Sequence, residues 1–192
     1  MSKTAFEKRG RAFEEEYFNK ENLKLVDKLK ALFQRKRNRE EIQQETGISD
    51  EEVLDNLVEL NVSGELLAAF QLLPILEVAW ADGEVDEREA KAVLLAAEQH
   101  GLLPGSSAYR MLEGGLQVRP RPDARAAWFA YAAELRKALS PAELDSFRKD
   151  LLEVCHTVAV ISGGLLNIAF TISPNEKVVM EKIEKALTHE AS

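Results

Sequence analysis

The stretch Trp80-Ala81-Asp82-Gly83-Glu84-Val85-Asp86-Glu87 decides the fold, because an apolar segment ends in it and an acidic segment begins. The residues ahead of it are too apolar for a solvated surface and predict a buried helix: Leu66, Leu67, Phe70, Leu73, Ile75, Leu76, Val78 and Ala79. Gly83 can adopt the left-handed conformation that ends a helix, and Asp86 can cap the next one. A tight helix-loop-helix is therefore predicted, and residues 80–87 are called the elbow below.

Acidic side chains crowd around the elbow. Asp82, Glu84, Asp86 and Glu87 fall within six residues, and Glu89 follows them. Carboxylate oxygens suit hard cations such as calcium or magnesium. The spacing imitates the start of a calcium loop, but an EF-hand also needs glycine at its sixth position and glutamate at its twelfth, and both are missing here. Asp86 and Glu89 also have capping-box spacing, so a structural role is the alternative for those two.

The motif Ala81-Asp82-Gly83-Glu84-Val85-Asp86 followed by Glu89, behind an apolar helix, resembles the TerB-like family of tellurite-resistance and stress-response proteins. The resemblance covers roughly Leu66 to the C-terminus. It implies an all-α, multi-helix domain of two related halves that holds a divalent cation on acidic residues of the elbow. The ligands that it implies are Asp82, Glu84, Asp86 and Glu89.

The C-terminal region repeats part of the elbow. Ile172-Ser173-Pro174-Asn175-Glu176 aligns with Val85-Asp86-Glu87-Arg88-Glu89, and each follows an apolar helix that ends in glycine. The second copy has Ser162 in place of Asp82 and inserts Leu165 to Thr171, so it lacks the acidic cluster. We expect a TerB-like domain over residues 64–192, preceded by N-terminal helices and a helix-turn-helix-like unit over residues 1–63.

The N-terminal segment from Thr4 to Arg37 predicts helix with a break near Asn19 to Asn22. Its second half carries one apolar stripe of an amphipathic helix, at Leu25, Val26, Leu29, Leu32 and Phe33. The first half offers aromatic anchors, at Phe6, Phe13, Tyr17 and Phe18. The segment is expected to be an appendage to the core, and the basic run from Arg35 to Arg39 is expected at a helix end.

Residues 39–57 predict a helix-turn-helix, with Ser49 as the cap of its second helix and Glu52 completing a capping box. A DNA-reading helix needs basic or amide side chains to meet phosphates and base edges. This second helix instead presents acids, namely Asp50, Glu51, Glu52, Asp55 and Glu59. The pattern favours a packing unit, or a docking site for a basic partner, over a DNA reader.

Turn and cap signals divide the rest of the chain. Pro74 predicts a kink or restart inside the apolar helix, and His100-Gly101 predicts the end of the acidic one. A short helix is expected over Ser107 to Glu113, with Gly114-Gly115 in a loop. Further helices are expected to start at two caps, Asp123 and Ser140, the latter followed by Pro141 and Glu143.

Composition restricts the class of protein. The 192 residues are 45% hydrophobic and 30% charged, as in globular proteins. One cysteine fits a reducing compartment, and Met1 to Arg11 lacks an apolar leader core, so a cytoplasmic protein is expected. Polar and glycine residues interrupt the segment from Leu151 to Phe170, which predicts a core helix and a loop in place of a transmembrane segment.

The net charge of −8 is unevenly distributed. Residues 1–39 carry twelve Lys or Arg against six acids, and residues 40–98 carry two against sixteen. The acidic middle of the chain is expected to attract cations or a basic partner and to repel nucleic acid.

No catalytic constellation is evident, and no enzyme is expected. Cys155 and His156 are neighbours, which on a helix point about 100° apart and make a poor nucleophile and base. The function expected from the resemblance is a non-enzymatic binding or adaptor module in stress or tellurite response that senses a divalent cation. The alternative is a helical scaffold that binds a protein partner without metal, with homo-oligomers left open, and the remote alternative is a nucleic-acid-binding regulator.

Overall fold

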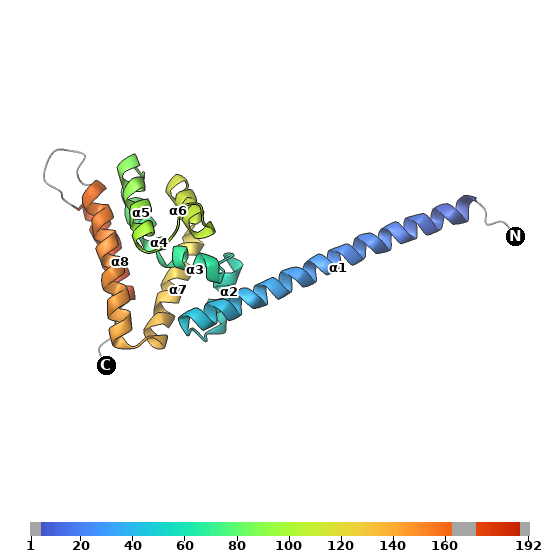
Figure 1. The fold of residues 1–192 in the computed structure, drawn as a ribbon, viewed down its shortest axis with the longest axis horizontal. Coiled ribbons are helices and arrows are strands. Elements are labelled where there is room, and N and C mark those ends of the chain that lie inside the picture. Colours follow the sequence, from blue (N-terminus) through green and yellow to red (C-terminus); the bar gives the residue numbers. More distant parts are fainter. Residues whose placement is uncertain (1–4, 163–171, 189–192) are drawn as a thin grey trace. The chain divides into compact units, whose positions relative to one another are not determined.

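The computed structural model describes residues 5–162 and 172–188, with side chains at Lys20, over 23–161 and over 172–188. Within these ranges all regular structure is α-helical, which confirms the all-α class, and no strand occurs (Figure 1). By compactness the chain divides into two units, Met1–Asn38 and Arg39–Ser192. The boundary predicted after residue 63 falls inside the second unit.

The described part of the first unit is a stretch of α1, the helix Ala5–Thr46. The helix has no break near Asn19 to Asn22, so that prediction is wrong. An asparagine costs a helix only about 0.7 kcal/mol relative to alanine, which is too little to end it. The run from Arg35 to Arg39 also lies within α1 and not at a helix end as predicted, because the helix continues to Thr46, ahead of Gly47 with φ +72°.

In the second unit, the last turns of α1 are joined to α2 (Glu51–Glu59) by ion pairs from Arg39 to Glu51 and Asp55. Ile42 is fully buried, and the buried hydroxyl of Thr46 donates a 2.7 Å hydrogen bond to the Ile42 carbonyl. The N-cap of α2 is Asp50, which accepts from the Val53 N–H, and the predicted cap at Ser49 is wrong. A carboxylate complements the positive end of the helix dipole, which a hydroxyl does not.

The apolar run ahead of the elbow forms two helices, α3 (Gly64–Gln71) and α4 (Leu73–Ala79). The restart predicted near Pro74 is confirmed, since Pro74 sits in the first turn of α4, where its missing N–H costs nothing. Every residue of α4 is buried. This helix contacts α5 (Glu87–Gln99), α6 (Ser107–Gln117), α7 (Pro122–Ala138), α8 (Pro141–Ser162) and α9 (Pro174–Ala186), and it is the centre of the core.

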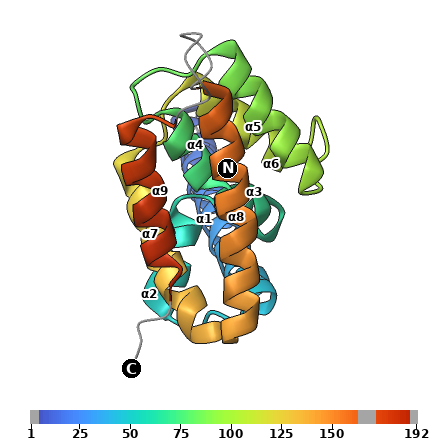
Figure 2. The same cartoon turned by 90° about the vertical axis from the view of Figure 1, so that its left-hand side faces the viewer.

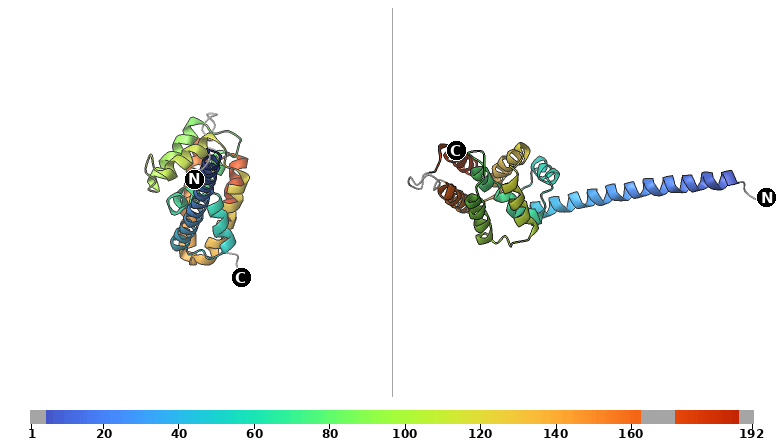
Figure 3. Two further views of the ribbon diagram at one scale, coloured as in Figure 1. Left: turned by 90° about the vertical axis from the view of Figure 1, so that its right-hand side faces the viewer. Right: turned by 90° about the horizontal axis from the view of Figure 1, so that it is seen from above.

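The outer helices pack around α4. Figure 2 shows α8 beside α9, and α8 also packs along α5, while α3 packs along α6. Figure 3 shows the ribbon from two further directions. The apolar segment from Leu151 supplies α8 with its buried face, at Leu151, Val154, Cys155, Val158 and Ala159. The elbow therefore joins the central helix to an outer layer.

The structure confirms some of the predicted ends and corrects others. Helix α5 ends at Gln99 and α8 begins at Pro141, as expected. Helix α6 runs on to Gln117, so Gly114-Gly115 is helical and not a loop. Packing of this helix in the core outweighs the helix cost of glycine, about 1 kcal/mol each.

The predicted cap at Asp123 is also wrong. Helix α7 begins one residue earlier, at Pro122, and Arg121 occupies the N-cap position. Proline suits the first turn of a helix because its φ is already helical. The Asp123 carboxylate instead accepts a 2.9 Å hydrogen bond from the N–H of Ala124.

Over residues 5–162 and 172–188, no single helix is long and apolar enough to cross a membrane. Helix α2 and the segment Gly64–Ala79 meet that test only as a pair bent by 93°. The predicted Gly163-Gly164 turn and the insertion from Leu165 to Thr171 lie outside the described residues.

Candidate functional site

The elbow has the predicted helix-loop-helix form. Trp80 is the C-cap of α4, and its indole N–H donates a 2.8 Å hydrogen bond to the Gly115 carbonyl of α6. Gly83 has φ +107°, a backbone conformation that a side chain would strain. These features fix the loop between the central helix and α5.

Two of the four predicted cation ligands form the cap of α5. One Asp86 oxygen accepts from the N–H groups of Arg88, at 2.7 Å, and Glu89, at 2.9 Å. The carboxylate of Glu89 accepts a 2.7 Å bond from the Asp86 N–H and is buried. These contacts are the reciprocal pair of a capping box, so the structural role predicted for both residues is confirmed.

The other two predicted ligands, Asp82 and Glu84, are exposed. Neither forms a hydrogen bond or an ion pair within the described part of the chain. Over the described residues, no three His, Cys, Asp or Glu side chains are grouped closely enough to hold a metal ion. The structure thus places all four residues at one elbow and separates two that cap a helix from two that face solvent.

The C-terminal counterpart of the elbow is also a cap. Ser173 accepts from the N–H of Glu176 at 3.2 Å, and the Glu176 carboxylate accepts from the N–H of Ser173 at 2.6 Å. Helices α5 and α9 therefore begin with the same capping box, as the aligned sequences predict.

A pocket that sequence reasoning missed lies between α4, α7 and α9. Its volume is about 240 Å³. Its lining is mostly apolar and aromatic, with Leu73, Pro74, Trp128, Phe129, Val179 and Ile183, and it includes three charged side chains, Glu77, Arg125 and Lys182. The rings of Trp128 and Phe129 meet edge to face, with centroids 5.4 Å apart. The pocket is therefore an apolar recess with a few charges in its wall.

The central charge of this pocket is Glu77, in the middle of the core helix α4. Its side chain is 9% exposed, and one oxygen pairs with the Arg125 guanidinium at 3.2 Å. Lys182 is exposed and has no ion pair among the described residues. A buried carboxylate is costly unless a cation compensates it, so Arg125 is held over the pocket by Glu77.

The Cys155 and His156 pair behaves as predicted. Cys155 is fully buried, and burial raises the pKa of its thiol to about 12, while the neighbouring His156 is exposed. The two side chains therefore do not form a nucleophile and its base.

Helix α2, the second helix of the predicted helix-turn-helix, has one apolar and one acidic face. It buries Val53, Leu54, Leu57 and Val58 and exposes Glu51, Glu52, Asp55 and Glu59.

Comparison of the chain with protein-family models, curated proteins and solved structures finds no match.

Proposed function

We propose that residues 39–192 form a non-enzymatic protein-binding module, whose pocket between α4, α7 and α9 takes an apolar side chain of the partner. The observation that carries this proposal is the Glu77–Arg125 ion pair in the wall of a mostly apolar recess. Apolar walls supply affinity, and a few fixed polar groups orient what binds. An ion pair anchored in the core holds Arg125 in place before the partner arrives.

The size of the pocket favours a protein partner over a free small molecule. Sites for small molecules usually enclose about 300 to 1,000 Å³. The volume here, about 240 Å³, suits one or two side chains of a peptide. Aromatic and apolar residues that fill such recesses are typical anchors of protein interfaces.

The charges of the pocket define the chemistry next to that anchor. Glu77 is already compensated by Arg125, so Lys182 leaves the mouth of the pocket with an excess positive charge. A partner segment with an apolar residue close to Asp or Glu complements this arrangement. Such a partner differs from the basic one expected for the acidic middle of the chain.

A cation-responsive TerB-like adaptor, acting in stress or tellurite response, is a second candidate. The observation in its favour is that Asp82 and Glu84, two residues apart in the elbow, are both exposed and serve no cap. The matching capping boxes of α5 and α9 support its two related halves. Two carboxylates and water would hold calcium weakly, and calorimetric titration of the full chain with calcium tests this candidate.

Selection from a displayed library of random peptides tests the main proposal. Peptides retained by the full chain should carry an apolar residue within about two positions of Asp or Glu. Fluorescence polarisation should show at least a tenfold loss of their affinity in Phe129→Ala and in Lys182→Glu. Lys91→Glu, an exposed change on α5, is the charge-matched control and should bind normally. Enriched peptides that bind the wild type, the two pocket variants and the control equally would contradict the proposal.

A further inference from the structure

The second half of the N-terminal unit exposes a row of large apolar side chains. The exposed fractions are 56% for Leu25, 45% for Val26, 45% for Leu29, 62% for Leu32 and 68% for Phe33. Isolated exposed apolar residues are normal, but five on one helix within nine residues form a patch. We call this set the α1 stripe.

The α1 stripe occupies one side of the helix. At 3.6 residues per turn, successive side chains are rotated by about 100°. The five residues then fall within an arc of about 120°, bounded by Leu32 on one side and Val26 on the other. This width is typical of a helix that buries one face against an apolar layer.

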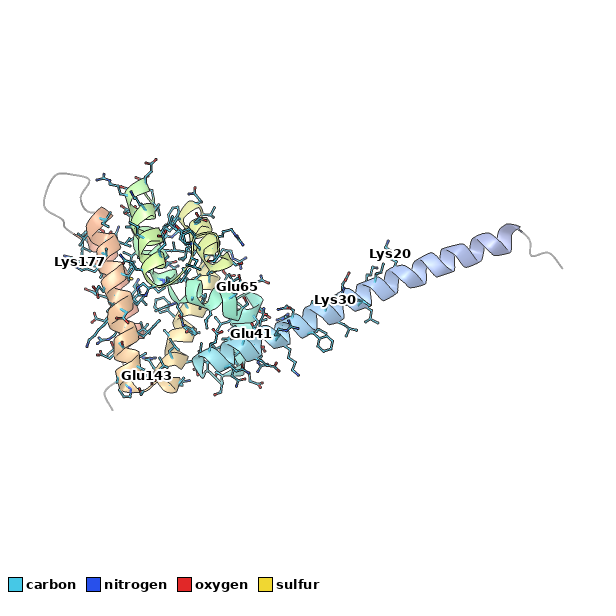
Figure 4. All side chains as sticks on the ribbon, in the orientation of Figure 1. Lys20, Lys30, Glu41, Glu65, Glu143 and Lys177 are labelled. Atoms are coloured by element: carbon cyan, nitrogen blue, oxygen red, sulfur yellow. The ribbon has the colours of Figure 1, made fainter. Side chains whose placement is uncertain are left out.

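Basic residues flank the stripe on both sides. Lys28 lies about 40° beyond Leu32, and Lys30 lies about 40° beyond Val26. Both are exposed, and Figure 4 shows Lys20 and Lys30 on the ribbon of α1. Residues 20–37 carry seven cations against two acids: Lys20, Lys24, Lys28, Lys30, Arg35, Lys36 and Arg37 against Glu21 and Asp27.

This distribution of charge argues against three other occupants. A second copy that docked stripe to stripe would bring together residues 20–37 of two chains, each with seven cations against two acids, which is unfavourable. Nucleic acid would satisfy the cations and leave the apolar stripe in water. An acidic protein helix could cover the stripe, but a planar surface meets the basic residues of both flanks at once.

We propose that the α1 stripe inserts into the interface of an anionic lipid surface, with residues 20–37 of α1 lying in the plane of that surface. The apolar side chains enter the acyl boundary, while Lys and Arg side chains extend to the phosphates and carboxylates of the headgroups. Residues 39–192, with their acidic α2, would then remain in the aqueous phase.

Flotation of the full chain with lipid vesicles tests the proposal. The chain should bind vesicles of phosphatidylcholine with about 30% phosphatidylserine, and bind pure phosphatidylcholine on the order of tenfold more weakly. Raising the salt from about 0.1 M to 0.5 M should reduce binding, because it shortens the screening length. Absence of binding to the anionic vesicles at low salt would overturn the proposal.

Paired variants separate the stripe from its charges. Leu29→Ser with Phe33→Ser should remove most of the binding, and Lys28→Glu with Lys30→Glu should weaken it by at least tenfold. Leu95→Ser and Lys91→Glu are the matched controls, because both residues are exposed on α5. All of these positions are exposed, and circular dichroism should show equal helix content.

Two outcomes would assign the stripe to another occupant and refute the lipid proposal. One is a concentration-dependent dimer in sedimentation that the Leu29→Ser/Phe33→Ser variant abolishes, with no flotation. The other is stripe-dependent binding to an acidic amphipathic peptide, again with no flotation. Equal flotation of the wild-type chain and both α1 variants would also refute it.

Discussion

The carboxylate of Glu77 in α4 pairs with the guanidinium of Arg125 in α7 at 3.2 Å, across 48 residues of sequence. Glu77 is 9% exposed and Arg125 is 45% exposed, so the pair connects the core to the surface. Breaking a fully buried pair costs about 3 to 5 kcal/mol, because one charge remains buried alone. Water that reaches the exposed arginine reduces this penalty.

We therefore expect Arg125→Ala to lower the free energy of unfolding by about 1 to 2 kcal/mol. Adding Glu77→Gln removes the uncompensated charge. The double variant should therefore lose less free energy of unfolding than the two single variants lose in total. Urea denaturation of all four proteins completes the cycle. Strictly additive losses would show that the pair contributes no coupling.

Sequence reasoning identified the helices of the core but not this pair. The run around Pro74 is apolar enough to predict burial on all sides, and the single carboxylate within it, Glu77, was the available signal of a paired buried charge. Its partner could not be predicted. Arg125 and Lys182 come from distant segments, and only the packing of α7 and α9 against α4 brings them to one pocket.

The local errors come from weak propensities, which are too small to end a helix or are outweighed by tertiary packing or a neighbouring residue. Asn19 and Asn22 do not break α1, since their helix cost is small. Ser49 loses the cap of α2 to its charged neighbour Asp50. The capping box of Asp86 and Glu89 was predictable because its signal is local to four residues.

A pair of adjacent glycines in α6 tests how tightly that helix packs. A Cβ added at Gly115 would collide with the Leu76 side chain, which is 2% exposed in the core. At Gly114 no atom lies within 4 Å of an added Cβ. Gly115→Ala should therefore destabilise by about 1 to 3 kcal/mol, and Gly114→Ala should stabilise by about 0.5 to 1 kcal/mol. Thermal unfolding of the two variants measures the difference. Equal midpoints would contradict the close approach of Gly115 in α6 to Leu76 in α4.

The buried thiol of Cys155 predicts a loss of stability at alkaline pH. Burial raises its pKa from 9.0 to about 12, so the unfolded chain releases the proton first as the pH rises. The stabilising contribution is complete below about pH 9 and disappears between pH 9 and 12. Urea denaturation at pH 7, 9 and 10.5 measures the free energy of unfolding. With rising pH, this free energy should decline less steeply for Cys155→Ala than for the wild type. Parallel declines would assign the alkaline loss to other groups, such as Tyr131, whose pKa burial raises to about 12.

Substitutions of the elbow carboxylates should affect stability differently, depending on whether the residue caps α5 or lies at the surface. Asp86→Ala removes an N-cap with two hydrogen bonds and should cost about 1 kcal/mol. Asp82→Asn changes an exposed side chain and should alter the stability of the calcium-free protein by less than about 0.5 kcal/mol.

Calcium then tests whether the surface pair binds an ion. An ion that binds only the folded chain raises the unfolding midpoint, and Asp82→Asn should remove that rise. Melting both variants and the wild type with calcium and with chelator makes the comparison. A wild-type midpoint that does not respond to calcium or magnesium would leave the elbow as a structural turn alone.

Two truncations test the boundary between the units. A chain that starts at Arg39 keeps the buried Ile42 and the ion pairs of Arg39 with Glu51, at 3.1 Å, and Asp55, at 3.4 Å. We expect it to unfold cooperatively, with a midpoint within about 4 °C of the full chain, since the lost residues form a separate compact unit.

A chain that starts at Gly47 loses Ile42 and Thr46 as well. Removing such a buried side chain costs about 2 to 5 kcal/mol, so its midpoint should fall by about 5 to 15 °C. Circular dichroism during heating measures both, and a chain from Arg39 that is unfolded at 25 °C would show that residues 1–38 belong to the core.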